Sequence, residues 1–307
     1  MSRIKLKPLE EQVIVITGAS SGIGLATALL GAKRGAKIVM GARSKDATAE
    51  IAAQIGAAGG EAVAVACDVT DRSQVEQLAS TALERFGRID TWVNNAGVSI
   101  YGRLEEVTEE DSRRLFETNF WGVYYGCLAA LPYLRQYGGA LINVGSEVSE
   151  TVVPLQGMYS TTKHAVKGLT DALRVEVEQV DEAPVAITLI QPTATDTPFP
   201  QHAKNYMAEE PKLPSPLDDP EDVAEAILKA ATKPTRSKKV GGMSKVNTMT
   251  AKVAPRMGDK MAAKYVERQQ YDEEPRHPEG TLDRPGELVG SAGRIRGSGG
   301  REKGSNQ

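Results

Sequence analysis

Apolar residues follow two alternating patterns along this chain. Short runs of mostly apolar residues are typical of strands buried on both faces, whereas apolar positions that recur every three or four residues predict amphipathic helices. Glycine, proline and small polar residues separate these segments and favour turns. The strands are predicted at 13–16, 37–41, 62–67, 89–93, 140–144 and 185–190, and the helices at 25–34, 44–57, 71–86, 108–134, 157–180 and 219–232.

This alternation of strand and helix predicts the fold class. Strands that are apolar on both sides need cover on both faces, and a helix between successive strands lets them run parallel. We therefore expect an α/β fold with a doubly wound parallel sheet in three layers. Residues 240–242 could add a final edge strand.

The pattern breaks after residue 232. We expect one domain over residues 1–242 and a C-terminal extension over 243–307, with helix-compatible spacing from Met243 to Arg268 and disorder beyond Gln270. Residues 1–232 carry 21 Lys and Arg against 31 Asp and Glu, whereas residues 233–307 carry 16 against 9. Acidic residues are interleaved with the basic ones and aromatic stacking partners are lacking, so a solvated end is favoured over nucleic-acid or lipid binding.

Composition narrows the class of protein. Plentiful alanine and glycine with few aromatic residues suit helices packed closely on a sheet. Cys67 and Cys127 lie in apolar segments, which favours buried reduced thiols over a disulfide. Neither a signal-peptide pattern nor a membrane-span pattern is recognised, so we expect a soluble cytoplasmic protein. His164, His202 and His277 are scattered without ligand spacing, and no metal site is predicted.

A glycine-rich turn joins the first predicted strand to the first predicted helix. Gly18, Gly22 and Gly24 allow a sharp turn and a close approach of the backbone to a ligand. The first amides of the helix would then face an anion such as a pyrophosphate. The spacing Gly-x-x-x-Gly-x-Gly differs from the common dinucleotide fingerprint, and taken alone it predicts a plain packing turn equally well.

Polar residues follow the other predicted strands, at the edge where doubly wound sheets bind ligands. Arg43 and Ser44 follow the second strand, and no acidic residue lies between this strand and Asp46. An acidic residue would accept a hydrogen bond from a ribose 2′-hydroxyl, whereas the guanidinium of Arg43 suits a 2′-phosphate. This place in the sequence therefore favours NADP(H) over NAD(H). A solvated loop arginine is a comparably common interpretation. Asp68 ends the third strand and could either bond an adenine or cap the helix that begins near Asp71.

The fourth and fifth strands end in further polar groups. The amides of Asn94-Asn95-Ala96-Gly97 could equally form an ordinary turn, and Ser146 follows the fifth strand. Tyr159 and Lys163 lie four residues apart on one face of the next helix, close enough for the ammonium to act on the phenol. Helices contain such pairs by chance, so the pair alone is weak evidence for a catalytic site. Together with the glycine turn it becomes strong evidence for one.

With these motifs in this order, the sequence resembles the short-chain dehydrogenase/reductase family, in its single-domain branch, over roughly residues 10–232. The resemblance implies a Rossmann fold and hydride transfer between NADP(H) and a small-molecule ketone, aldehyde or alcohol. It also implies a homodimer or homotetramer. The motifs are Thr17-Gly18-Ala19-Ser20-Ser21-Gly22-Ile23-Gly24, Asp68-Val69, Asn94-Asn95-Ala96-Gly97, Ser146 and Tyr159-Ser160-Thr161-Thr162-Lys163.

The resemblance also implies a catalytic tetrad of Asn119, Ser146, Tyr159 and Lys163. Reduction of a ketone needs a hydride at carbon and a proton at oxygen, so Tyr159 would be the acid, its pKa brought down from about 10 by Lys163. Ser146 would hold the carbonyl oxygen, Lys163 would hold the nicotinamide ribose, and Asn119 would position a water that relays protons to Lys163. The expected cofactor-binding residues are Gly18, Ser20, Ser21, Gly22, Ile23, Gly24, Arg43, Ser44, Asp68, Val69, Asn95, Ala96, Gly97, Tyr159, Lys163, Pro192, Thr193, Thr195 and Thr197.

Two positions depart from the family pattern. Thr193 follows Pro192 where the family usually has glycine, which changes the loop expected to bind the nicotinamide carboxamide through Thr195 and Thr197. Glu147 follows Ser146 directly, and its charge could reject acidic substrates or face solvent.

Residues outside the motifs are expected to set the substrate, which we expect to be a mid-sized, partly apolar carbonyl or alcohol. The proline-rich segment 199–217 suits a lid better than a regular helix. A nucleotide-binding sensor without turnover is an alternative that the filled tetrad disfavours. A sugar-nucleotide epimerase or dehydratase is less favoured, because those relatives carry Gly-x-x-Gly-x-x-Gly and a larger C-terminal domain. The expected pocket residues are Ser99, Tyr101, Val148, Val153, Pro154, Gln156 and Met158.

Overall fold

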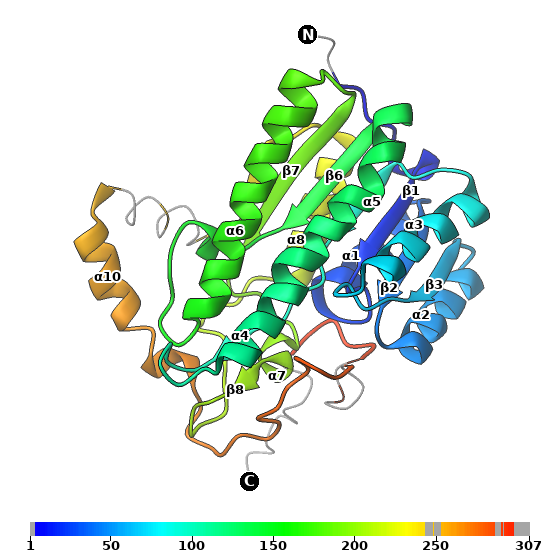
Figure 1. Ribbon diagram of the computed structural model, residues 1–307. Coiled ribbons are helices and arrows are strands. Elements are labelled where there is room, and N and C mark those ends of the chain that lie inside the picture. The colour runs from blue at the N-terminus through cyan, green and yellow to red at the C-terminus, as the bar shows by residue number, and fades with distance from the viewer. Residues whose placement is uncertain (1–3, 243–247, 249–252, 286–289, 291, 298–307) are drawn as a thin grey trace.

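A twisted parallel sheet lies between two layers of helices in the computed structural model, which describes residues 4–242, 248, 253–285, 290 and 292–297 (Figure 1). The main sheet has seven strands in the order β3-β2-β1-β4-β6-β7-β9. Every pairing in it is parallel, and the order reverses between β1 and β4. The strands are β1 (Val13–Thr17), β2 (Lys37–Ala42), β3 (Ala62–Ala66), β4 (Thr91–Asn94), β6 (Gly139–Val144), β7 (Val185–Pro192) and β9 (Ser237–Val240). The predicted doubly wound α/β fold is confirmed.

The helices cover both faces of the sheet, and the central strands have apolar side chains on both sides. In β1, Ile14 and Ile16 pack under α1 (Gly22–Lys33) and α8 (Pro220–Thr232), whereas Val13 and Val15 pack under α3 (Arg72–Phe86) and α5 (Gly122–Tyr137). All four side chains are buried, as expected for a parallel strand between two layers. The helices are α1 (Gly22–Lys33), α2 (Lys45–Ala57), α3 (Arg72–Phe86), α4 (Glu109–Phe116), α5 (Gly122–Tyr137), α6 (Gly157–Arg174), α7 (Phe199–His202), α8 (Pro220–Thr232) and α10 (Pro255–Ala263).

Two of the long predicted helices contain π-helical segments. The helix expected over 108–134 is divided into α4 and α5 by η2 (Glu117–Trp121), and the helix expected over 157–180 continues beyond α6 as η4 (Val175–Val180). A single π turn leaves the apolar period almost unchanged, so the sequence pattern could not indicate it. The small parallel pair β5 (Ile100–Tyr101) and β8 (Lys204–Asn205) was also missed, because two-residue strands carry no periodic signal.

The C-terminal extension differs most from the prediction. Disorder is expected beyond Gln270, yet residues 271–285 and 292–297 lie against the carboxyl edge of the sheet, and Leu282 is completely buried. Backbone hydrogen bonds to the main domain hold this segment, and such contacts leave no periodic pattern in a sequence. Of the helix expected over 243–268, α10 is present, whereas residues 243–247 and 249–252 lie outside the described residues.

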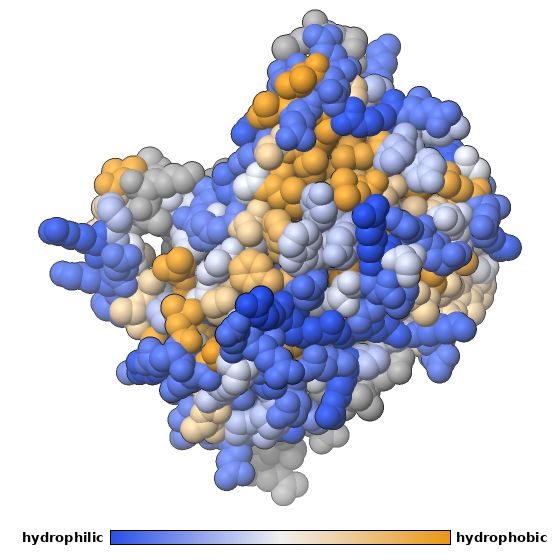
Figure 2. Space-filling view, viewed as in Figure 1, coloured by the Kyte–Doolittle hydropathy of each residue, from blue (hydrophilic) through white to orange (hydrophobic). Residues whose placement is uncertain are grey.

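Apolar side chains gather on the outer face over α5 and α6 (Figure 2). Trp121 is 39% exposed, Val175 54% and Val180 72%. Trp121 packs edge-on against Tyr124, with 5.7 Å between the ring centroids. In the described part of the chain, no helix is long and apolar enough to cross a membrane.

Candidate active site

A cavity of about 250 Å³ opens at the carboxyl edge of the sheet, where the loops after β1, β2, β3, β4, β6 and β7 meet. Parallel strands all end at this edge, so the polar groups predicted at separate strand ends come together there. Each residue predicted to bind the cofactor lines the cavity except Gly24, and each tetrad residue does so except Asn119.

The glycine turn is shaped by close backbone packing. Gly18 has a φ of +67°, and a Cβ there would lie 2.7 Å from the Cα of Ala96. A Cβ on Gly24 would overlap the carbonyl oxygen of Gly18, so Gly24 keeps α1 close to the turn and does not face the cavity. The side-chain Nδ2 of Asn95 donates to the carbonyl oxygens of Thr17 at 3.0 Å and Gly18 at 3.1 Å. These contacts join the two loops that flank the reversal of strand order.

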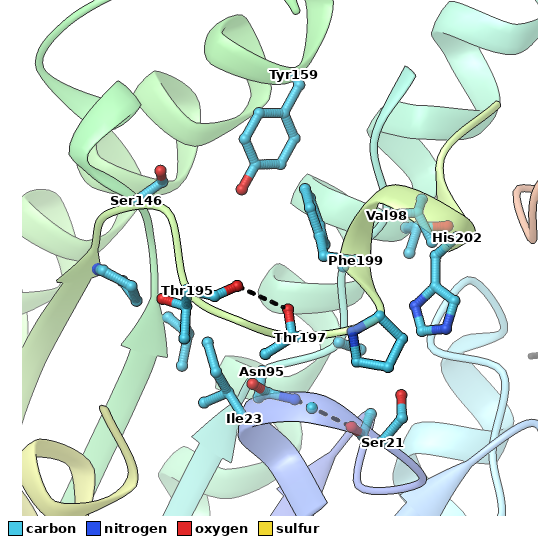
Figure 3. A pocket seen from close by; sticks show the side chains of 18 of the residues that line it. Ser21, Ile23, Asn95, Val98, Ser146, Tyr159, Thr195, Thr197, Phe199 and His202 are labelled. Atoms are coloured by element: carbon cyan, nitrogen blue, oxygen red, sulfur yellow. Dashed lines mark hydrogen bonds between the residues drawn. The ribbon is translucent and has the colours of Figure 1, made fainter. Parts of the chain in front are cut away.

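Tyr159 reaches the cavity from the first turn of α6, and Ser146 reaches it from just after the end of β6 (Figure 3). Lys163, one turn after Tyr159, also lines the cavity. The Tyr159 ring is packed against Phe199, with 5.4 Å between the ring centroids, and the residue is 8% exposed. Lys163 is buried, its Nζ donates to the carbonyl oxygen of Val144 at 3.0 Å, and it lies 5.7 Å from the Tyr159 ring centroid.

The charges of this pair differ from the expectation. Burial raises the pKa of Tyr159 above its ordinary value, and the Ser146 hydroxyl acts in the opposite direction. The predicted net lowering of the Tyr159 pKa is therefore not found in this structure, where burial has the larger effect. Burial also lowers the pKa of Lys163, to about 8. The phenol is thus protonated near neutral pH, which suits a proton donor.

Asn119 lies in the π turn η2 and is completely buried behind the cavity wall. Its Oδ1 accepts from the amide of Val98 at 2.9 Å, and its Nδ2 donates to the carbonyl oxygen of Val98 at 2.9 Å and to Thr162 Oγ1 at 3.1 Å. A Cβ on Gly97 would lie 3.4 Å from Asn119 Oδ1 and 3.6 Å from Lys163 Nζ. Asn119 therefore joins the loop after β4 to α6, close to the Lys163 ammonium.

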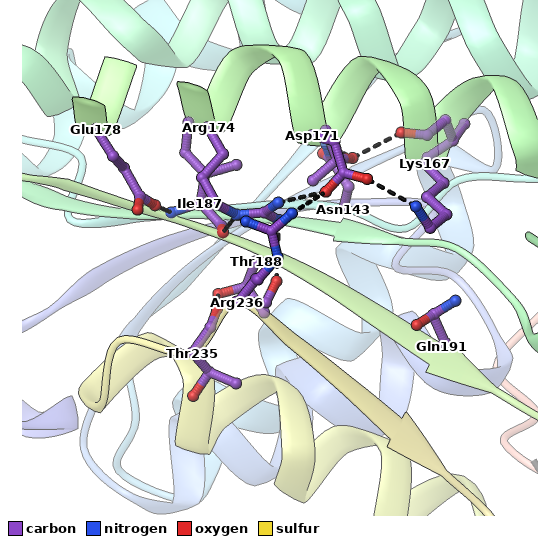
Figure 4. Close-up of polar contacts among 12 residues, drawn as sticks. Asn143, Lys167, Asp171, Arg174, Glu178, Ile187, Thr188, Gln191, Thr235 and Arg236 are labelled. Carbon is purple, nitrogen blue, oxygen red and sulfur yellow. Dashed lines mark hydrogen bonds and ion pairs between the residues drawn. The ribbon is translucent and has the colours of Figure 1, made fainter. Parts of the chain in front are cut away.

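A buried arginine holds α6 against the sheet (Figure 4). Arg174 donates through Nε to the carbonyl oxygen of Ile187 in β7 at 3.0 Å and through Nη2 to that of Arg236 at 2.9 Å. Its Nη1 lies 2.5 Å from Asp171, which also pairs with Lys167 at 2.7 Å. These bonds hold the C-terminal end of α6, the helix whose first turns carry Tyr159 and Lys163.

The loop after β7 is held despite its threonine in place of glycine. The Thr193 hydroxyl donates to the carboxylate of Asp218, and the amide of Asp218 donates to the carbonyl oxygen of Ala194 at 2.8 Å. The amide of Asp196 in turn donates to the carbonyl oxygen of Asp218 at 2.9 Å. Asp218 thus ties this loop to the residues before α8, and Thr195 and Thr197 still face the cavity.

At the ends of β2 and β3, Arg43 and Asp68 both line the cavity. The cap of α3 is Asp71, which accepts from the amide of Ser73 at 2.9 Å, so the interpretation of Asp68 as that cap is wrong. Asp68 instead accepts from the amide of Thr70 at 3.0 Å. Arg43 is largely surrounded by protein, and its Nη2 donates to the carbonyl oxygen of Thr281 at 2.6 Å.

The other end of the cavity has a mostly apolar wall. Val148, Val153 and Gln156 line it as expected, and Glu147 faces the cavity and is half-buried. Phe199, Leu213 and Pro214 contribute from the segment predicted to be a lid. The remaining expected pocket residues do not line the cavity: Ser99, Tyr101, Pro154 and Met158.

Two cavity residues from the extension, Gln269 and Thr281, were not predicted from the sequence, because the extension shows no α/β pattern. Gln269 is completely buried and accepts from Gln156 Nε2 at 2.7 Å. His202, from the segment predicted to be a lid, also lines the cavity, and burial lowers its pKa to about 4, an effect strengthened by the charges of Arg43 and Arg294. Within the described residues, no three His, Cys, Asp or Glu side chains are grouped as a metal site.

Comparisons with known proteins agree with this geometry. The short chain dehydrogenase family matches residues 12–207. An uncharacterized oxidoreductase of Bacillus subtilis, YxnA, is 44% identical over 280 residues, which cover 90% of this chain and 78% of the relative.

Two solved structures are similar as well. One is an alcohol dehydrogenase from Thermococcus sibiricus complexed with 5-hydroxy-NADP, with a TM-score of 0.64 and 33% identity, covering 75% of this chain and 94% of its own. The other is a short chain dehydrogenase/reductase from Burkholderia phymatum in complex with NAD, with a TM-score of 0.69 and 27% identity, covering 87% and 99%. The shared fold, the matched family and the assembled strand-end motifs agree: the chain is an oxidoreductase that belongs to the short-chain dehydrogenase/reductase family.

Proposed function

We propose that this protein is an NADP(H)-dependent oxidoreductase that interconverts a ketone or aldehyde with the corresponding alcohol, with Tyr159 as the acid and base. The observation that carries the proposal is the meeting of the Tyr159 and Ser146 hydroxyls at one cavity, with the Lys163 ammonium buried beside them. A substrate carbonyl oxygen at this place could accept hydrogen bonds from both hydroxyls.

Each side chain has a separate task in the proposed reduction. Ser146 binds the carbonyl oxygen, and Tyr159 gives its proton to that oxygen as negative charge develops on it. Burial keeps the phenol protonated before the reaction, since it raises the pKa of Tyr159. The Lys163 ammonium then favours the phenolate that remains. Asn119, tied to Val98 and Thr162, keeps this part of α6 in register with the loop after β4.

The cavity fits a nicotinamide dinucleotide, which supplies or accepts the hydride. Gly18 and Gly22 have φ values of +67° and +54°, a conformation that favours glycine. With no side chain at these positions, the backbone at the start of α1 can come close to the pyrophosphate of such a ligand. The Arg43 guanidinium beside the cavity suits a 2′-phosphate. The residues that would hold the dinucleotide are Ser20, Ser21, Gly22, Ile23, Arg43, Ser44, Asp68, Val69, Asn95, Ala96, Gly97, Tyr159, Lys163, Pro192, Thr193, Thr195 and Thr197.

The wall beyond Tyr159 supports a mid-sized, partly apolar substrate. Val148, Val153, Phe199 and Leu213 offer apolar surface there. Glu147 faces the same cavity, so an acidic substrate would meet like charge.

The first prediction concerns the acid. Tyr159→Phe should lower reduction of a ketone or aldehyde panel by about 10²- to 10⁴-fold, the usual contribution of a positioned acid, while NADPH affinity changes less than about twofold. Tyr101→Phe is the matched control, because Tyr101 is also buried and its hydroxyl has no hydrogen bond to a described residue. Steady-state NADPH oxidation and NADPH fluorescence titration measure both. Retained turnover in Tyr159→Phe would overturn the acid assignment, and NADPH binding without turnover by the wild type would favour a sensor.

The second prediction concerns the cofactor. Arg43→Asp should weaken NADPH binding by about 10- to 100-fold, because a charged hydrogen bond to the phosphate contributes about 1.5 to 3 kcal/mol. NADH, which lacks the 2′-phosphate, should lose far less affinity. Fluorescence titration of both cofactors measures the ratio, and equal losses for NADPH and NADH would contradict the proposed role of Arg43.

The third prediction concerns the buried ammonium. The pKa of Lys163 is about 8 in the folded protein and about 10.4 for an unfolded lysine. Below pH 8 both states hold the proton, and the full cost of burying the charge is present. Between pH 8 and about 10.4 the folded state releases its proton first, so that cost declines as the pH rises.

Lys163→Met should therefore raise the free energy of unfolding at pH 7 by roughly 1 to 3 kcal/mol, after loss of the bond to Val144, and the gain should shrink by pH 10. Urea denaturation at the two pH values measures it. Lys167→Met, which removes a half-buried lysine paired with Asp171, should give no such gain. A gain that is the same at both pH values would show that the charge of Lys163 is not its cause.

We also propose that the protein is a homodimer or homotetramer that associates through the apolar face over α5 and α6. Trp121 and Val175 are exposed on elements of this face, and monomeric proteins seldom expose such patches without a partner. Trp121→Lys should lower the sedimentation coefficient to that of a smaller species. Val253→Lys, at a residue 76% exposed on the C-terminal extension, should leave it unchanged, and an unaltered Trp121→Lys protein would exclude this interface.

A further inference from the structure

The described residues 278–285 and 292–297, here named the C-terminal clamp, cross the outer side of the cavity. Figure 1 shows this orange-to-red part of the chain passing α7 and the loops at the carboxyl edge of the sheet. The carbonyl oxygen of Pro278 accepts from the amide of Asn205 at 2.7 Å, and the amide of Thr281 donates to the carbonyl oxygen of His202 at 2.9 Å. The clamp is thus bonded to both ends of the segment from α7 to β8.

The clamp also contacts the glycine turn itself. The amide of Gly293 donates to the carbonyl oxygen of Ser20 at 2.8 Å, and the amide of Gly22 donates to that of Arg294 at 2.9 Å. Further along, Arg296 pairs with Asp219 at 2.6 Å. The clamp is therefore bonded to the turn expected to receive the pyrophosphate.

Arg43 is the cavity residue that the clamp holds most directly. Its Nη2 donates to the carbonyl oxygen of Thr281 at 2.6 Å, and its Nη1 approaches that of Leu282 at 3.4 Å. A guanidinium has five N–H donors in one plane, so bonds along one side fix the direction in which the other donors point. A free arginine side chain would lose about 2 kcal/mol of rotamer entropy on binding a phosphate, and a side chain already held in place loses less.

Leu282 anchors this contact. Its side chain is 0% exposed and packs in the cluster that contains Val98 and Leu115. Beside it, Asp283 pairs with Arg114 of α4 at 3.2 Å. An apolar anchor and an ion pair on neighbouring residues hold the Thr281 and Leu282 carbonyl groups against Arg43.

From these contacts we propose that the C-terminal clamp is part of the cofactor site and sets the preference for NADP(H), by holding Arg43 in the direction that a 2′-phosphate needs. This inference rests on the proposed use of NADP(H). In this proposal, Thr281 and Leu282 are positioning residues that act through Arg43. The extension thereby has a function in the cofactor site, although it lies outside residues 12–207, which the family model matches.

Gly280 allows a sharp test of the clamp. Its φ is +54°, and a Cβ there would overlap the carbonyl groups of Ala203 and His202. Gly280→Ala should therefore lift the clamp away from α7 and Arg43 without changing a residue of the main domain. Gly290→Ala is the matched control, because Gly290 has a φ of +63° and a Cβ there would meet nothing within 4 Å.

The experiment compares NADPH and NADH dissociation constants of the full-length wild type and both variants by fluorescence titration, with circular dichroism as the check of folding. Gly280→Ala should raise the NADPH constant about tenfold or more and the NADH constant less than about threefold. Gly290→Ala should resemble the wild type. If Gly280→Ala proves unfolded, Leu282→Ala in the full-length chain replaces it, because it removes the buried side chain that anchors the clamp, with the same expected change in the ratio.

Two outcomes would overturn the clamp's role. One is an unchanged ratio of NADPH to NADH constants in Gly280→Ala, and the other is an equal loss for both cofactors, which would indicate general cover and not positioning of Arg43. Arg43→Asp separates this inference from the proposed function. If Arg43→Asp removes the preference and Gly280→Ala does not, only the clamp inference fails, whereas a wild type without preference overturns both.

Discussion

The parallel direction of all strands in the main sheet is the constraint on which this structure depends. Because the strands run the same way, every loop that follows a strand emerges at one edge. Residues that are far apart in the sequence therefore reach the same cavity, because each of them follows a strand. They are the glycine turn, Arg43, Asp68, Asn95, Ser146 and the threonines after β7. The two helical layers make this arrangement stable by burying both faces of every central strand.

The chemistry proposed for α6 places a charge where it lowers the stability of the fold. Lys163 is a buried cation whose pKa is lowered to about 8 by burial, and its described hydrogen bond is to a neutral carbonyl group. An unneeded charge at such a place would be costly in a fold with a net stability of about 5 to 15 kcal/mol. The bonds of Arg174 to β7 and to Arg236 hold the far end of the same helix, so α6 remains fixed although its first turns carry this cost.

The C-terminal extension covers part of the carboxyl edge of the sheet and lines part of the cavity there. Its apolar contacts are few, with Leu282 completely buried and Ile295 packed against a core cluster, and backbone hydrogen bonds and ion pairs hold the rest of it. Gln269 closes the opposite end of the cavity through its bond to Gln156.

The sequence by itself determined the α/β class, the positions of the principal strands and helices, and the residues at the strand ends, because apolar periodicity and short motifs are local signals. It also indicated the Asp71 cap of α3 and the pairing of Tyr159 with Lys163 on one helix face. Tertiary structure alone decided the direction in which the pKa values of that pair shift, since both shifts are caused by burial. It likewise decided that Asn119 points to Val98 through a π turn, that Asp218 holds Thr193, and that the extension covers Arg43. These features rest on contacts between residues tens to hundreds of positions apart, and no local pattern records them.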